Sequence, residues 1–333
     1  MAAATLLDES ALSVYVLLAL TASVTVGVTL LMGHAGQVSL GHGAFYAAGA
    51  YAAGLLAKHG FPSWIALLVA PVAAAGIAAV VGIPLLVLRG HHLAFATLAM
   101  HLIFLSLISE LSITGGDVGL QAIPPLGFAG VTLSSVRSYA FLSAGALVLV
   151  VALARNLLVS RPGRALRALS SSEVAAASSG VAVGHYKLAV FALSAGFAGL
   201  AGGIYAFYMG YLSPGSFPVM LSIEYIVMAA VGGLGKVSGA VAGSALVFLL
   251  VHGLSRISTL SGMPGTAPII LSYAVYAVLL VSAVLFLPGG LVAFVLARWE
   301  RPGARSERAA PVSEAKPGDP ANEGVTSKHG SFS

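Results

Sequence analysis

Long, uninterrupted apolar runs constrain this sequence more than any other feature. A helix needs about 20 apolar residues to cross the hydrocarbon core of a bilayer, and the first such run, residues 11–32, contains no charged side chain. Only 8% of the residues in the whole chain are charged, against about 25% in a soluble domain. Membrane β-barrels instead show alternation within segments of about 10 residues. The sequence therefore predicts an all-α, polytopic helical membrane protein.

Further apolar runs follow, and one of them is unusually short. Residues 220–234 contain Glu224 and end near paired glycines, a combination typical of a discontinuous helix. We expect about 8–10 transmembrane helices with broken or re-entrant segments: nine crossings if this run spans, and eight if it dips in and returns. The later runs are residues 36–57, 64–88, 93–108, 139–159, 188–211, 220–234, 237–253 and 269–296.

Charge predicts which ends of the helices face the cytoplasm. Residues 155–187 carry a cluster of arginines, and such clusters favour the cytoplasmic side. Counting back from this loop places residues 110–138 outside, Arg89 inside, Lys58 outside and residues 33–34 inside. The permease domain is predicted to be residues 1–300, with a cytoplasmic loop at about 160–186. Within that loop, residues 163–177 predict one short amphipathic helix, and residues 301–333 predict a disordered cytoplasmic tail.

Residues 33–56 combine two features that rarely occur together in an apolar run. Glycine destabilises a helix by about 1 kcal/mol relative to alanine, and polar side chains at membrane depth usually face a protein interior or a wet cavity. Two interpretations fit this stretch. Either the glycines serve close helix packing through small residues, or the stretch is a flexible element that lines a substrate path. The substrate-path candidates in this stretch are Gly36, Gln37, Ser39, Gly41 and His42. Residues 36–39 (GQVS) are echoed at 235–238 (GKVS), and transporters often contain internal repeats.

Several kinds of chemistry have no matching motif in the sequence. The chain has no cysteine. Residues 233–236 (GLGK) resemble the end of a phosphate-binding loop, but Ala230 stands where the first glycine belongs and Val237 replaces the serine or threonine. We therefore expect no enzyme activity, no cofactor and no metal site. Few acidic groups lie within the spans, so we expect either a passive conduit or a transporter whose energy comes from a partner. The net charge of +5 belongs to loops and tail, so we expect no nucleic-acid partner.

Six motifs occur in order along residues 30–294. They read GHAGQVSLGHGAFYAAGAY (33–51), LRGHHLAFATLA (88–99), TGGDVGL (114–120), SRPGRALRAL (160–169) ahead of YKLAVFALSAGFAGLAGG (186–203), SIEYIVMAAVGGLG (222–235) and FLPGGL (286–291). In these motifs the chain resembles the inner-membrane permease subunits of branched-chain amino acid ABC transporters, in their LivM-like branch. The second motif differs from the family pattern by an extra residue before Phe95.

The resemblance implies a multi-pass subunit of an ATP-driven importer in the bacterial inner membrane. Its implied partners are a second homologous permease subunit, two cytoplasmic ATPase subunits and an extracytoplasmic binding protein. The remaining substrate-path candidates are Thr114, Gly115, Gly116, Glu224, Gly232 and Gly233. The cytoplasmic loop would dock on an ATPase, with coupling candidates Arg161, Arg164, Arg167, Glu173, Ala176 and Gly180. Here Val174 interrupts the family's E-A-A-x-x-x-G pattern.

Two alternatives stay open. The first is an ABC permease for urea, short amides or simple sugars. A sugar path would be expected to show more aromatic and amide side chains than a chain with 8% aromatic residues provides. The second alternative is a stand-alone channel or secondary carrier.

Overall fold

The computed structural model describes residues 9–85, 88, 90–128 and 131–260, together with a few isolated positions between 270 and 281. Contacts divide the chain into two units, Met1–Val295 and Leu296–Ser333, and every described residue belongs to the first. Arg89, most of the predicted run 269–296 and the predicted tail 301–333 lie outside the described residues.

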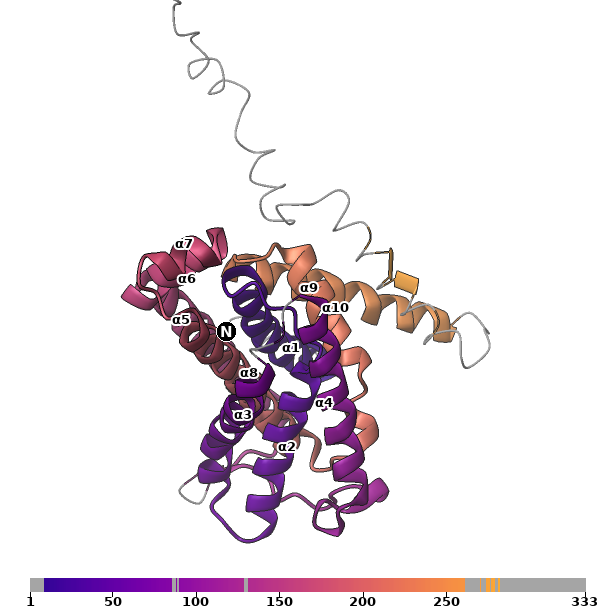
Figure 1. The fold of residues 1–333 in the computed structure, drawn as a ribbon. Coiled ribbons are helices and arrows are strands. Elements are labelled where there is room, and N and C mark those ends of the chain that lie inside the picture. The colour runs from indigo at the N-terminus through magenta and orange to yellow at the C-terminus, as the bar shows by residue number, and fades with distance from the viewer. Residues whose placement is uncertain are drawn as a thin grey trace, which may run out of the picture. The chain divides into compact units, whose positions relative to one another are not determined.

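Helices dominate the described part of the chain, which confirms the predicted all-α membrane fold (Figure 1). Within the described residues, six stretches are long and apolar enough to cross a membrane; one of them, residues 214–232, joins a short turn to a short helix, and α10 adds a shorter apolar stretch. The predicted total of 8–10 crossings depends on residues beyond 260 and stays a prediction. The long helices are α1 (Glu9–His34), α2 (His42–Lys58), α3 (Ser63–Leu85), α4 (His91–Glu110), α5 (Val136–Val159), α8 (Val183–Met209) and α10 (Val237–Leu260), and the short α9 is Met220–Gly232.

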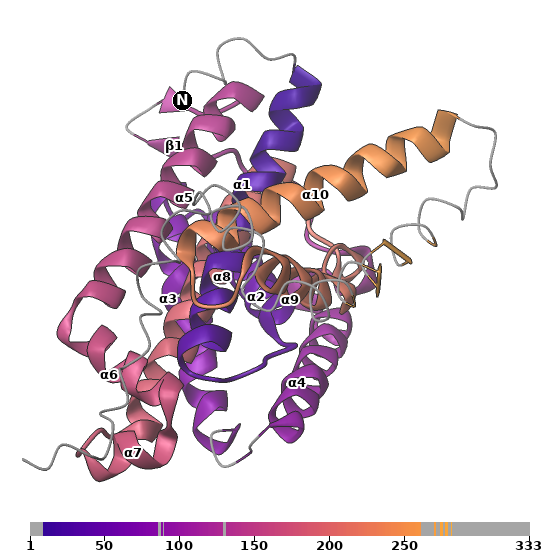
Figure 2. The ribbon, with the colours of Figure 1, turned by 90° about the horizontal axis from the view of Figure 1, so that it is seen from above.

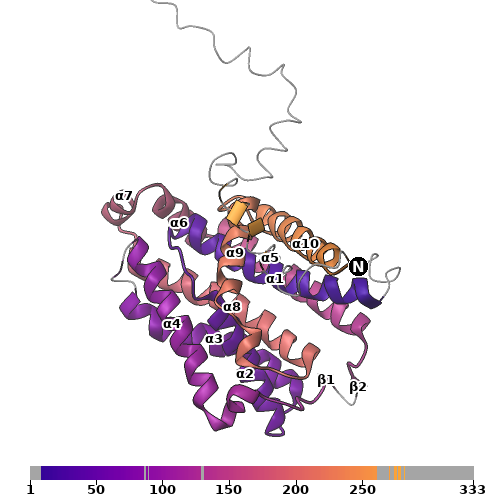
Figure 3. The same cartoon turned by 90° about the vertical axis from the view of Figure 1, so that its right-hand side faces the viewer.

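Helix α8 packs closely against α2 and α3 through small residues (Figure 3). A methyl group added at Gly49 of α2 would overlap the backbone of Gly199 in α8, and one added at Gly199 would overlap the side chain of Ala74 in α3. Such close backbone approach is how helices associate in a bilayer, where the hydrophobic effect does not drive their packing. The glycines of α8 between residues 196 and 203 therefore form a packing surface.

The segment between α4 and α5 is short, broken structure, as its glycines and prolines predict. It contains the 3₁₀ turns η2 (Ser112–Thr114) and η3 (Gly116–Val118) and the paired strands β1 (Gly127–Phe128) and β2 (Val131–Thr132). The hydroxyl of Ser63 donates to the carbonyl of Pro125 at 3.2 Å, so this segment meets the α2–α3 turn. In Figure 3 the two strands lie at the opposite end of the bundle from α6 (Arg161–Ser171) and α7 (Glu173–Ser178).

Two expected helix boundaries are wrong. The run at 36–57 becomes helical only at His42, and residues 35–41 are not helical. In this segment Leu40 N–H donates to Thr97 Oγ1 of α4 at 3.0 Å instead of to a helix carbonyl. Residues 163–177 were expected to form one amphipathic helix, but α6 ends at Ser171 and α7 begins at Glu173. Between them Ser172 is extended, and its hydroxyl caps α7 by accepting from Ala175 N–H. Serine favours such caps over helix interiors.

The predicted break near residue 233 is present. Helix α9 has 13 residues, about 20 Å at 1.5 Å per residue, which is shorter than a membrane core of about 30 Å. It ends at Gly233, whose φ of 104° is closed to most side chains. Helix α10 then begins at Val237 and packs against α9 and α1 (Figure 2).

Candidate functional site

The interruption between α1 and α2, residues 35–41, is the central feature of the candidate site. The side chains of Gln37, Ser39 and His42 are all buried, at 4%, 1% and 0% exposure. Non-helical backbone carries polar groups that must be satisfied by protein or by water when it is buried. Part of this backbone is satisfied by side chains, because Gly41 N–H donates to Ser39 Oγ at 3.3 Å and Leu40 N–H donates to Thr97.

A buried polar relay joins the start of α2 to α4 and α9. Gly43 N–H of α2 donates to Ser222 Oγ of α9 at 2.9 Å. The same hydroxyl lies 3.2 Å from His101 Nδ1 of α4, and His101 Nε2 lies 3.2 Å from the carbonyl of Phe217. A carbonyl can only accept, so we assign the ring proton to Nε2, which leaves Nδ1 to accept from the Ser222 hydroxyl. Every hydrogen bond in this relay then has one donor and one acceptor.

A second buried contact fixes the ring of His42. Its Nε2 lies 3.1 Å from Ser194 Oγ of α8, and that hydroxyl donates to the carbonyl of Phe191 at 2.9 Å. Because the hydroxyl has a single proton, His42 Nε2–H donates to it. The other ring nitrogen, Nδ1, has no protein partner. His42 therefore anchors α2 to α8 and keeps one acceptor unused.

The two helix breaks lie side by side. A methyl group added at Gly33 would overlap the backbone of Gly235, and one added at Gly235 would lie 3.5 Å from His34 Cε1. The segments that echo one another in sequence, residues 36–39 and 235–238, therefore belong to two breaks that lie close together in space. Helix breaks that meet in this way are a common feature of substrate sites in transporters.

A polar cavity of about 310 Å³ opens beside the first break. It brings together the α1–α2 interruption, the start of α4, α7 and α8, which the charge pattern placed at the cytoplasmic side. Gln37 Oε1 is buried here without a protein partner, and Glu173 forms an ion pair with Lys187. The lining residues are Gly36, Gln37, Leu88, Gly90, Leu93, Glu173 and Lys187.

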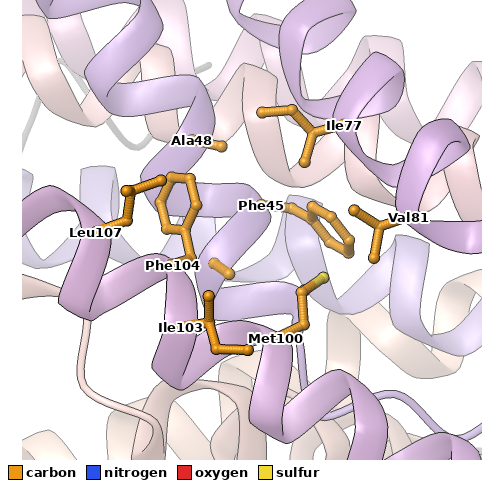
Figure 4. Close-up of a pocket in the computed structure, with 9 residues that line it drawn as sticks. Phe45, Ala48, Ile77, Val81, Met100, Ile103, Phe104 and Leu107 are labelled. Atoms are coloured by element: carbon orange, nitrogen blue, oxygen red, sulfur yellow. The ribbon is translucent and has the colours of Figure 1, made fainter.

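A separate cavity of about 170 Å³ lies between α2, α3 and α4, and its lining is apolar (Figure 4). The side chains of Phe45, Val81 and Phe104 point into it, and the thioether of Met100 supplies the only heteroatom in the picture. A charged or zwitterionic ligand would find no hydrogen-bond partner among these side chains. We therefore place the candidate polar site at the cavity beside Gln37.

The structure separates the predicted substrate-path residues into groups. Thr114 lies at the far end of α4, where its hydroxyl is within 2.6 Å of the carbonyls of Ile108 and Leu111. Its neighbours Gly115 and Gly116 have φ of 87° and 61° and shape the same turn. These three residues are not brought together with residues 36–42, because the 20 residues of α4 put about 30 Å between its ends.

The candidates on α9 have different surroundings. Glu224 is half-buried on that helix. A methyl group added at Gly232 would overlap the backbone of Gly239 in α10. Gly232 thus provides close packing between α9 and α10, while Gly233 provides the backbone turn that separates them.

The predicted coupling residues lie on α6 and α7, and most are exposed. Arg161 and Arg164 are exposed, and Arg167 Nη1 donates to the carbonyl of Leu158 at 2.6 Å. Helix α6 buries Gly163, Leu166 and Leu169 against the bundle. Of the other three candidates, Glu173 is exposed and forms an ion pair with Lys187, and Ala176 is buried. Gly180 is exposed and has a φ of 81°.

Sequence reasoning missed the residues that hold the interruption in place. They are Thr97, His101, Ser194 and Ser222, all of them buried. Each is a polar residue within an otherwise apolar run, and that alone could have marked them. Their partners are 57 to 179 positions away, so no local spacing predicts the pairing.

The candidate spans, together with interrupted helices that carry buried polar groups, define a multi-pass membrane protein of the transport class. Residues 10–287 match the family described as "Branched-chain amino acid transport system / permease component". The chain belongs to this family.

Two curated relatives are similar over 235 residues. Both are described as "High-affinity branched-chain amino acid transport system permease protein LivM": the one from Escherichia coli (strain K12) is 32% identical, and the one from Salmonella typhimurium (strain LT2) is 34% identical. The matches cover 63% of this chain and 55% of each relative, so the chain spans about half the length of these relatives. No solved structure matches the chain.

Proposed function

We propose that this chain is the translocation-pathway subunit of an ATP-driven ABC importer for branched-chain or other aliphatic amino acids. One observation carries the proposal: the interruption at residues 35–41 is held by the buried relay and opens onto a polar cavity. Broken helices of this kind supply backbone and side-chain groups to substrates in the middle of a membrane. Family membership and the names of the relatives support the choice of solute.

The helix breaks provide the flexibility that a transport cycle needs. Residues 35–41 and 233–236 lack regular helical hydrogen bonding over their lengths and can absorb changes in backbone angles. The helices on either side are packed backbone to backbone through glycines such as Gly49, so they move as rigid bodies. Rocking of rigid helices around a fixed site is the usual form of alternating access.

The energy for import would come from partner subunits. We propose that α6 and α7 form the surface that docks on a cytoplasmic ATPase. The exposed Arg161 and Arg164 would face the ATPase. The residues that maintain the shape of this surface would be Arg167, Glu173, Ala176 and Gly180. A second homologous permease subunit and an extracytoplasmic binding protein complete the assembly. Supporting this role, α6 is strongly amphipathic and buries only its apolar face, which leaves its basic face available for a protein partner.

Reconstitution tests this function directly. The chain is purified with its partner subunits, placed in proteoliposomes, and assayed for uptake of labelled leucine with and without ATP. We expect uptake that requires ATP, the ATPase subunits and the binding protein. Uptake that persists without the ATPase would indicate a channel or carrier, and ATP-dependent uptake of urea but not leucine would overturn the choice of solute.

A further inference from the structure

The ion pair between Glu173 and Lys187 lies on the wall of the polar cavity beside the α1–α2 interruption. Lys187 belongs to α8 and its side chain is 13% exposed, whereas Glu173 belongs to α7 and its side chain is 45% exposed. Gln37 also lines this cavity; its side chain is 4% exposed, and its buried Oε1 has no protein partner. Opposite charges and a residue with an unused buried acceptor thus line the same solvent-open cavity.

This set of groups matches the chemistry of an amino acid zwitterion. A carboxylate needs a cation, an ammonium group needs two or three acceptors, and charge-assisted hydrogen bonds of this type are the strong ones. Lys187 is the cation, while Glu173 and Gln37 Oε1 are acceptors. Leu88 and the buried Leu93 supply apolar surface on the same cavity, which suits an aliphatic side chain. The volume of about 310 Å³ falls within the range of about 300–1,000 Å³ typical of ligand pockets.

We propose that this cavity is an exit-side binding site for the transported amino acid, in which Lys187 binds the α-carboxylate, Glu173 and Gln37 bind the α-ammonium group, and Leu88 and Leu93 contact the side chain. The proposal rests on the proposed import function and adds a place where the substrate is bound before release. The cavity lies at the end of the bundle that carries α7, which the charge pattern assigns to the cytoplasm.

The two charges of the site compensate each other. Glu173 and Lys187 form an ion pair, so neither charge is left uncompensated. An ion pair that is open to water on one side stabilises a fold only weakly, so a zwitterion can separate the two side chains and pair with each of them. One internal ion pair is exchanged for two substrate contacts, and the net charge of the cavity does not change.

The experiment measures binding and uptake by the intact complex in parallel. Labelled leucine is bound to the complex in nanodiscs without the binding protein, so that only sites on the complex are read, and leucine uptake is measured in proteoliposomes. The competitors are leucine, isoamylamine, which lacks the carboxylate, and 4-methylpentanoate, which lacks the amine. The variants are Glu173→Gln, Lys187→Gln and the charge exchange Glu173→Lys with Lys187→Glu. The controls are Lys58→Gln and Glu110→Gln, which change exposed charges away from the cavity.

We expect only leucine to compete, and each single variant to weaken leucine binding by about tenfold or more, as loss of a hydrogen bond to a charged group does. The charge exchange rebuilds the ion pair but reverses its polarity relative to Gln37 and the leucines, so binding stays weak. Restored binding in the exchanged variant would mean that the pair is only a latch and would overturn the site. Equal competition by isoamylamine would also overturn it. If the wild-type complex takes up leucine and the variants still bind leucine normally, the proposed site is wrong but the import function stands. If the wild-type complex takes up no leucine, the proposed function itself is wrong.

Discussion

Replacing Ser222 by alanine tests whether the buried relay holds the interruption in place. The hydroxyl accepts from Gly43 N–H and donates to His101 Nδ1, so its loss leaves two buried groups unpaired. A buried polar group left without a partner costs about 1–3 kcal/mol, and hydrogen bonds between membrane helices contribute about 0.6 kcal/mol each on average. We expect the variant to lose about 1–3 kcal/mol in the free energy of unfolding, with a parallel loss of leucine uptake.

Ser143→Ala is the matched control. Ser143 is also fully buried, but its hydroxyl donates to the carbonyl of Ala140 within α5, so its removal orphans no group on another helix. Both variants are unfolded by titration with denaturing detergent in mixed micelles, and leucine uptake is measured in proteoliposomes. The reasoning is refuted if Ser222→Ala is within about 0.5 kcal/mol of Ser143→Ala, a difference that is ordinary for a neutral substitution.

Three further predictions address packing, the cavity and coupling. Gly49→Ala should lower the free energy of unfolding by about 1–3 kcal/mol, because its methyl group overlaps Gly199. The control, Gly145→Ala, adds a methyl group that meets nothing within 4 Å, so it should be neutral or slightly stabilising in the same detergent titration. Gln37→Met should keep the thermal stability of the complex, since it removes a buried acceptor without a protein partner, yet reduce leucine binding; a matched fall in stability would contradict the assignment. Arg164→Gln should reduce substrate-stimulated ATPase activity with complex assembly unchanged, and unaltered hydrolysis would remove the case for α6 as the docking surface.

Most helix positions could be predicted from the sequence because they depend on local composition. The runs at 11–32 and 139–159 became α1 and α5, with ends that differ by three residues or fewer. A span of apolar residues has one stable conformation in a bilayer, since every backbone group must be satisfied within the segment. Hydropathy therefore fixes where a membrane helix lies even when its neighbours are unknown.

The glycines and polar side chains of residues 33–43 predict a flexible break, but the bounds of the interruption at residues 35–41 do not follow from local composition. They depend on Thr97 of α4, which accepts a hydrogen bond from Leu40 N–H. The relay has the same character, because Ser222 and Gly43 are 179 positions apart. The ion pair of Glu173 with Lys187 joins residues 14 positions apart on two different helices, and the docking motif that contains Glu173 does not predict it. Contacts between distant segments decide each of these features, and a single sequence does not contain them.

Helix α9 connects the two interruptions into one mechanical unit. Near its beginning, Ser222 braces the first turn of α2 at Gly43, and after its end, Gly235 packs against Gly33 where α1 stops. A 13-residue helix is a stiff rod of about 20 Å, so a shift at one contact displaces the other. The breaks at residues 35–41 and 233–236 are therefore not independent hinges: a rearrangement of the α1–α2 interruption requires a matching movement at the α9–α10 break.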